Sequence, residues 1–203
     1  MISYILRAQE RGLPAQAGFT LIETLVAVSL LVIAIVAPMS LVAQSLTTAY
    51  YARDQVAAYS LAQEGIESVR AVRDGNILSN ATAGTSFNLL DSIPIGTNFT
   101  VDATVAGGAG LTACGSSCPL LKVDPAGVLY GHNAAWTVFT KFRRVAYAQY
   151  VGPAAINTDP VSGKGRDEIR VTVTVTWETA TGRTRFFKMY SNMYRWVEDG
   201  AAN

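Results

Sequence analysis

Charge is missing from a long stretch near the start of this chain: no Asp, Glu, Lys or Arg lies between Thr24 and Ala52. An apolar segment of this length can cross a lipid bilayer, and it is longer than the core helix of a globular protein usually needs. The absence of charge therefore argues against a buried core helix. It favours a segment that lies in lipid or packs tightly among other helices.

Residues that commonly carry chemistry are also scarce. The chain has one histidine, His132, and two cysteines, Cys114 and Cys118. A zinc site would need further Cys or His ligands at suitable spacing, and His132 lies between Gly131 and Asn133 in a turn-like setting. The sequence contains no Gly-x-Ser-x-Gly elbow, phosphate-binding loop or dinucleotide fingerprint. We therefore predict no catalytic residue, no metal site and no cofactor.

The charges that flank the apolar run predict its orientation. Arg7 and Arg11 precede the run, whereas the first charges after it, Arg53 and Asp54, cancel each other. The more basic flank of a membrane segment usually stays in the cytoplasm. We therefore expect one pass through the inner (cytoplasmic) membrane, a cytoplasmic N-terminus and an exported C-terminal part.

The two cysteines would then lie in an oxidising compartment, where a pair is usually bridged. Cys114 and Cys118 enclose three small residues, whereas thiol redox sites usually have two residues between their cysteines. A disulfide between Cys114 and Cys118 that closes a small loop is favoured, with free thiols as the alternative.

One continuous helix is predicted from Phe19 to about Arg73. Residues 19–52 form its apolar half, and residues 53–75 form an amphipathic half. Apolar residues in the second half recur at three- and four-residue spacing, which predicts a stripe packed on a globular domain. The residues of this stripe are Val56, Tyr59, Ala62, Ile66, Val69 and Val72. The sequence Asp74-Gly75-Asn76 is expected to end the helix, because Gly75 can adopt the left-handed conformation after the last turn.

Residues 76–203 are predicted to form a globular β domain. Residues 76–131 are rich in Gly, Ser, Thr, Asn and Pro and indicate a variable loop region with a small strand or two. Residues 136–197 are expected to form an antiparallel sheet of three strands, in which the middle strand alternates strictly between apolar and polar residues. The expected strands are Trp136 to Val151, Ile169 to Glu178 and Thr184 to Trp196. The predicted fold class is α+β, with the helix stripe covering the apolar face of the sheet.

The start of the apolar run has a distinctive order of residues. A polar leader, residues 1–18, ends at Gly18, the apolar residues begin at Phe19, and a single acid, Glu23, follows. A carboxylate inside a membrane segment costs about 2.5–3.5 kcal/mol, so its presence indicates a function. The block from Gly18 to Ile33 resembles the processing site and helix start of type IV pilins and pseudopilins.

Two other kinds of signal compete with this resemblance. An ordinary secretory signal peptide is cut after its apolar region at small residues, but the candidate at residues 41–44 is poor. A signal anchor that is never cut accounts for the apolar run and leaves Glu23 without a reason.

The resemblance implies a processed structural subunit and not an enzyme. Prepilin peptidase would remove the cytoplasmic leader by cutting after Gly18 and would methylate the new amine of Phe19. The helix of residues 19–52 would span the membrane first and pack into the core of a filament afterwards, at the cell surface or in the periplasm. Glu23 would pair with the N-terminal amine of a neighbouring pilin or pseudopilin subunit, of the same or another kind.

Two further features bear on assembly. Pro38 removes a backbone hydrogen bond from the apolar half, so a kink or local unwinding is expected there. It is either a tolerated membrane-helix proline or, as in pilin-like helices, the place where the helix loosens during filament packing. The run from Ala62 to Asn76 resembles the helix end of minor pilins and pseudopilins of the pilus-modification kind.

Two alternative functions stay open. One is a membrane-anchored exported binding domain that uses a pilin-like signal. The other is a DNA-capturing competence pilin, because Lys141, Arg143 and Arg144 interleave with aromatic residues. Without residues 1–18 the chain has equal numbers of basic and acidic residues, and this balance argues against nucleic acid as a partner. The sequence does not distinguish a pilus, a type II secretion pseudopilus and a competence filament.

Overall fold

The computed structural model describes residues 18–83, 90, 92–105, 107–151, 168–179 and 182–194. The chain divides into two compact units, Met1–Ala49 and Tyr50–Asn203. Two predicted features lie outside the described residues: the leader up to residue 17 and the strand end at Trp196.

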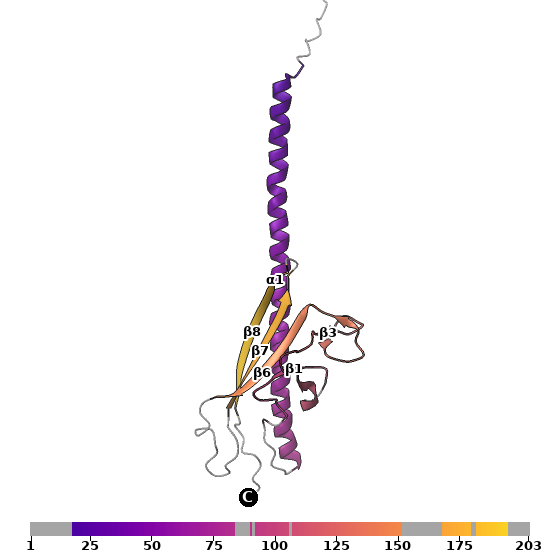
Figure 1. Ribbon diagram of the computed structural model, residues 1–203, viewed down its shortest axis with the longest axis vertical. Coiled ribbons are helices and arrows are strands. Elements are labelled where there is room, and N and C mark those ends of the chain that lie inside the picture. Colours follow the sequence, from indigo (N-terminus) through magenta and orange to yellow (C-terminus); the bar gives the residue numbers. More distant parts are fainter. Residues whose placement is uncertain are drawn as a thin grey trace, which may run out of the picture. The chain divides into compact units, whose positions relative to one another are not determined.

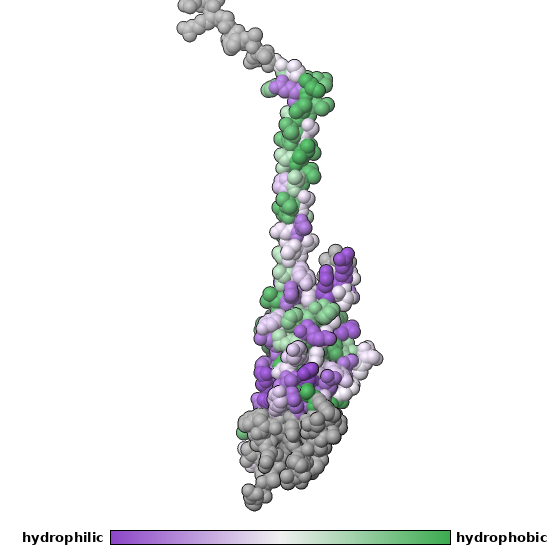
Figure 2. Space-filling view, turned by 90° about the vertical axis from the view of Figure 1, so that its left-hand side faces the viewer, coloured by the Kyte–Doolittle hydropathy of each residue, from purple (hydrophilic) through white to green (hydrophobic). Residues whose placement is uncertain are grey.

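The described part of the first unit is almost entirely helical. The helix α1 begins at Leu21 and ends at Ala83 (Figure 1). All side chains from Gly18 to Arg53 are exposed, and hydrophobic side chains cover the helix near its start (Figure 2). This helix is the one helix in the described residues that is long and apolar enough to cross a membrane, with a mean hydropathy of 2.7 in its most apolar part.

In the second unit α1 buries one stripe of side chains. The buried apolar residues of α1 are Ala58, Leu61, Ala62, Ile66, Val69 and Val72. One member of the predicted stripe is wrong, because Val56 is 68% exposed. Tyr59 lies at the edge of the stripe: it is 44% exposed, and its ring packs edge to face on Phe187 with the ring centres 5.6 Å apart. At about 100° per residue, Val56 lies roughly 120° around the helix from Ala62 and so faces away from the stripe.

The helix does not end at Gly75 as predicted but continues to Ala83. A glycine ends a helix where it takes a positive φ, and Gly75 is not among the described glycines that do so. Gly75 instead stays helical, at a cost of roughly 1 kcal/mol relative to alanine.

Five antiparallel strands form the main sheet, in the order β2-β1-β6-β7-β8. The strands are β1 (Asn98–Val101), β2 (Leu111–Ala113), β6 (Phe142–Tyr150), β7 (Glu168–Glu178) and β8 (Thr184–Tyr194). On β7 the odd-numbered residues from Ile169 to Trp177 are buried and the even-numbered ones are not, which confirms the predicted alternation. The buried face packs with the α1 stripe in one core (Figure 1), so the α+β class is confirmed.

The strand predicted from Trp136 to Val151 is divided in two. Its first part, β5 (Val138–Phe139), pairs with β3 (Lys122–Val123) in a second sheet of order β4-β3-β5, where β4 is Tyr130–Gly131. The division falls at Thr140, whose N–H donates to the Leu121 carbonyl at 2.8 Å. The predicted loop region, residues 76–131, holds four short strands among its described residues and not one or two. Of these, β1 and β2 join the main sheet, whereas β3 and β4 belong to the second sheet. The region also contains the 3-10 helix η1 (Gly107–Gly110).

Candidate processing and assembly site

The bond between Gly18 and Phe19 lies just outside the helix. Residues 18–20 are not helical, and α1 begins at Leu21. No heavy atom lies within 4 Å of the position that a Cβ on Gly18 would take, and Phe19 is 79% exposed. The predicted cleavage site is therefore an accessible, non-helical segment, which is the form in which a protease can take up a peptide.

Thr20 caps the helix that follows. The Glu23 N–H donates to Thr20 Oγ1 at 3.3 Å, and the Thr24 N–H donates to the Thr20 carbonyl at 3.1 Å. Thr20 and Glu23 thus occupy the first and last positions of the capping-box pattern Thr-x-x-Glu. The predictions from the sequence did not include this cap, although the spacing of Thr20 and Glu23 indicates it.

Glu23 lies in the first turn of α1. The positive end of the helix dipole favours a carboxylate at this place by about 0.3–1 kcal/mol. Glu23 takes part in no ion pair within the described residues. The Glu23 side chain is exposed, so another molecule can reach its carboxylate.

Pro38 lies inside α1, and the residues on both sides of it are helical. Nearby, Ser40 Oγ donates to the Ala37 carbonyl at 2.8 Å. The loosening of the helix at Pro38 stays a prediction.

Cys114 and Cys118 form a disulfide, with their Cα atoms 4.9 Å apart. The closed loop is held on β1, because the Cys114 N–H donates to the Asn98 carbonyl at 2.9 Å. Asn98 Nδ2 also donates to the Gly115 carbonyl at 2.9 Å. The bridge thus fastens a surface loop to the main sheet.

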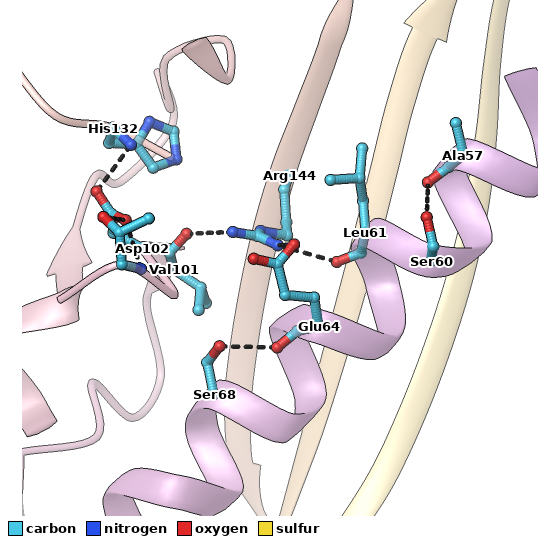
Figure 3. Close-up of polar contacts among 10 residues, drawn as sticks. Ala57, Ser60, Leu61, Glu64, Ser68, Val101, Asp102, His132 and Arg144 are labelled. Atoms are coloured by element: carbon cyan, nitrogen blue, oxygen red, sulfur yellow. Dashed lines mark hydrogen bonds and ion pairs between the residues drawn. The ribbon is translucent and has the colours of Figure 1, made fainter. Parts of the chain in front are cut away.

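Arg144 is the largest fully buried side chain of the described residues (Figure 3). Its Nη1 donates to the Leu61 carbonyl at 3.1 Å and to Glu64 Oε2 at 2.9 Å, and its Nη2 donates to the Val101 carbonyl at 2.7 Å. Burial lowers the pKa of Arg144, and the neighbouring carboxylate of Glu64 opposes that shift. Arg144 therefore connects α1, β1 and β6 through one buried guanidinium.

A second polar cluster lies beside Arg144 (Figure 3). The His132 N–H donates to Asp102 Oδ2 at 2.8 Å, and the Thr104 hydroxyl donates to Oδ1 at 2.6 Å. Burial raises the pKa of Asp102, but these hydrogen bonds outweigh it and leave the pKa below its ordinary value. Burial, and next the charge of Arg144, lower the pKa of His132, so the folded domain favours the neutral imidazole.

The predicted basic strand does not present three free cations. Arg144 is fully buried, so it is not available to a nucleic acid. Lys141 Nζ pairs with Asp54 of α1 at 2.6 Å. Arg143 remains exposed. Two of the three cations on which the DNA-capture hypothesis rests are therefore not free to bind DNA.

Groups of three or more His, Cys, Asp or Glu side chains that could hold a metal ion do not occur in the part of the chain that the structure describes. The absence of a metal site from the chain stays a prediction.

Comparison with known proteins points to the same N-terminal segment. A family model described as the prokaryotic N-terminal methylation motif matches residues 13–37. No curated protein and no solved structure matches the chain. The match covers Gly18, Phe19 and Glu23. The chain carries the N-terminal methylation motif, the signature of type IV pilins and their prepilin precursors.

Proposed function

We propose that this protein is a minor pilin or pseudopilin, a structural subunit of a type IV filament system. One observation carries the proposal: the methylation motif at residues 13–37 leads into an apolar helix whose side chains are all exposed up to Arg53. An exposed apolar surface of this extent needs a cover. Lipid supplies that cover before assembly, and the helices of neighbouring subunits supply it afterwards.

Prepilin peptidase cuts after Gly18 and methylates the amine of Phe19. Accessible backbone at residues 18–20 supports this step, since the scissile bond can be reached without unwinding α1. Methylation keeps the positive charge of the amine. The processed chain would therefore begin with a cation one residue before the capping residue Thr20.

The new amine of Phe19 gives the Glu23 carboxylate a cationic partner. A positive charge at a helix N-terminus is opposed by the helix dipole, and an acid in an apolar surrounding favours a cationic partner. The Glu23 carboxylate of one subunit and the Phe19 amine of the next offset both costs. This pairing would set the axial register of the subunits in the filament.

The first experiment is mass spectrometry of the protein recovered from its cells. We expect a mature chain that begins at N-methylated Phe19. A mature chain with any other N-terminus would contradict the proposal.

The second experiment tests assembly by replacing the charge alone. Glu23→Gln should leave cleavage after Gly18 intact and reduce the amount of the protein in sheared filaments by roughly tenfold or more, since a charge-assisted bond contributes about 1.5–3 kcal/mol. Gln44→Leu, which also changes an exposed polar residue of the apolar half, is the matched control and should assemble normally. Equal incorporation of Glu23→Gln and Gln44→Leu would show that charge pairing does not dock the subunit.

A further inference from the structure

The two edges of the main sheet differ in length. One edge strand, β2, has three residues and leads directly into the disulfide loop that starts at Cys114. The other edge strand, β8, has eleven residues and lies at the outer border of the sheet (Figure 1). Natural proteins commonly keep edge strands short, because a long edge can pair with the strand of another chain. The fold therefore protects one edge of the sheet and leaves the other long.

Backbone groups along the outer edge of β8 are free to pair. Every residue from Thr184 to Tyr194 has a partner on β7 in an unbroken register, so no bulge interrupts the strand, and the strand contains no proline. In an antiparallel pair every second residue points its N–H and C=O groups away from the partner strand. Within the described part of the chain, β7 is the one strand that pairs with β8. A row of backbone donors and acceptors therefore follows this edge.

Large aromatic side chains of β8 are exposed on the face of the sheet that α1 does not cover. Phe186 is 70% exposed, Tyr190 is 67% exposed and Tyr194 is 53% exposed. On the opposite face of the strand, Phe187 packs on Tyr59 of α1. Exposed aromatic residues are typical of protein interfaces and unusual on the rest of a protein surface. The composition of this edge therefore favours a protein partner.

Positive charge selects the kind of partner. Arg183, Arg185 and Lys188 are exposed, and none of them forms an ion pair with another described residue. The strand β8 contains no acid, and the acids of β7, Glu168 and Glu178, lie opposite its two ends. Two copies paired through β8 would double these cations along one seam without an acid to offset them. The charge therefore argues against a second copy and favours an acidic strand.

We propose that the free edge of β8 binds an extended, acidic segment of another protein, which joins the main sheet as a further strand. Backbone hydrogen bonds to β8 supply affinity, as in other cases of strand addition. Acids of the segment pair with Lys188 and the neighbouring arginines, and its apolar residues pack on Phe186 and Tyr190. All of these residues belong to the unit Tyr50–Asn203, so the interaction depends neither on the methylation motif nor on the apolar half of α1.

A peptide of alternating Glu and Val that matches the eleven residues of β8 is the probe. Fluorescence anisotropy of the labelled peptide measures its binding to the full-length protein in an uncharged detergent, and hydrogen exchange with mass spectrometry locates it. We expect the bound peptide to slow the exchange of β8 amides. The same peptide with methylated backbone nitrogens keeps its charges but cannot donate to β8, so it should not bind.

Charge reversal tests the choice of partner. Lys188→Glu should weaken binding of the acidic peptide about fivefold or more, because an attractive pair across the strands becomes a repulsive one. The same peptide with Lys in place of Glu should bind Lys188→Glu more tightly than it binds the unchanged protein. Arg143→Glu is the matched control, since it reverses an exposed charge on β6, two strands from β8, and it should bind the acidic peptide as the unchanged protein does.

Each part of the proposal can be contradicted. No binding of the acidic peptide at millimolar concentration, or equal binding of its methylated form, would show that β8 does not accept a strand. Equal weakening by Lys188→Glu and Arg143→Glu would show general attraction between charges and no site at this edge. Slow exchange of β8 amides in the protein alone that is lost on dilution would assign the edge to a second copy of the chain.

Discussion

Removing the carboxylate that faces the buried Arg144 tests how the long helix is held on the sheet. In Glu64→Met the guanidinium keeps the carbonyls of Leu61 and Val101 as acceptors but loses its only anionic partner among the described residues. Methionine has nearly the helix propensity of glutamate. The change in stability therefore reports on the ion pair and not on the helix.

The expected loss follows from the exposure of the two partners. Breaking a buried ion pair costs about 3–5 kcal/mol when one charge is left behind. The Arg144 side chain is fully buried, but the Glu64 side chain is 36% exposed, so water already screens part of the attraction. We expect Glu64→Met to lower the free energy of unfolding by about 2–3 kcal/mol.

A matched control lies one turn further along the same helix. Glu67 pairs with Arg70 at 2.6 Å, and both of these side chains are more exposed than a third. Glu67→Met should cost about 0.2–0.5 kcal/mol, as is usual for a surface pair at this spacing. The assay is urea unfolding of the full-length protein in detergent, followed by near-ultraviolet circular dichroism.

The double variant Glu64→Met/Arg144→Met sharpens the test. It removes both charges and leaves chiefly the Val101 carbonyl without its donor, at a cost of about 1 kcal/mol. The double variant should therefore be more stable than Glu64→Met alone. Equal losses in Glu64→Met and Glu67→Met, or a double variant less stable than the single one, would refute this account of the ion pair.

Two further predictions concern the helix and the polar cluster beside it. A Cβ on Gly65 would lie 3.1 Å from Val173 Cγ1, whereas one on Gly75 would have no neighbour within 4 Å. Gly65→Ala should therefore destabilise the protein by about 1–3 kcal/mol, and Gly75→Ala should stabilise it by about 0.5–1 kcal/mol. Thermal unfolding measures both changes. The opposite order would refute the close packing at Gly65. Because the pKa of His132 is lowered from 6.5 in the folded protein, the unfolded chain binds the proton more readily, and the free energy of unfolding should fall as the pH drops below 6.5. His132→Gln should reduce this fall in urea unfolding at about pH 7.5 and about pH 5.5, and an unchanged fall would show that other groups cause it.

Several local features were predictable from the chain because neighbouring residues produce them. The alternation along β7 came from a period of two between adjacent side chains. The pairing of Cys114 with Cys118 involves cysteines four residues apart. The Thr20 cap is also a local feature, since it joins residues three apart. The Thr-x-x-Glu pattern in the sequence was sufficient to predict it.

Other features were not predictable because they depend on partners far away in the sequence. Three neighbouring basic residues cannot be told apart by their positions in the sequence. In the structure Lys141 pairs with Asp54 of α1, Arg143 is exposed and Arg144 is buried. The burial of Arg144 requires Glu64, which lies 80 residues away and reaches it only when β6 packs on α1. The division of the predicted strand at Thr140 likewise requires Leu121.

The order of residues along the chain was enough to determine the methylation motif, the charge-free helix and the alternating strands, because each rests on short-range spacing and on the mismatch between apolar side chains and water. Tertiary structure decided which cation is buried and which face of α1 meets the sheet. Those outcomes depend on the register of elements that are distant in the sequence, and packing in three dimensions alone sets that register.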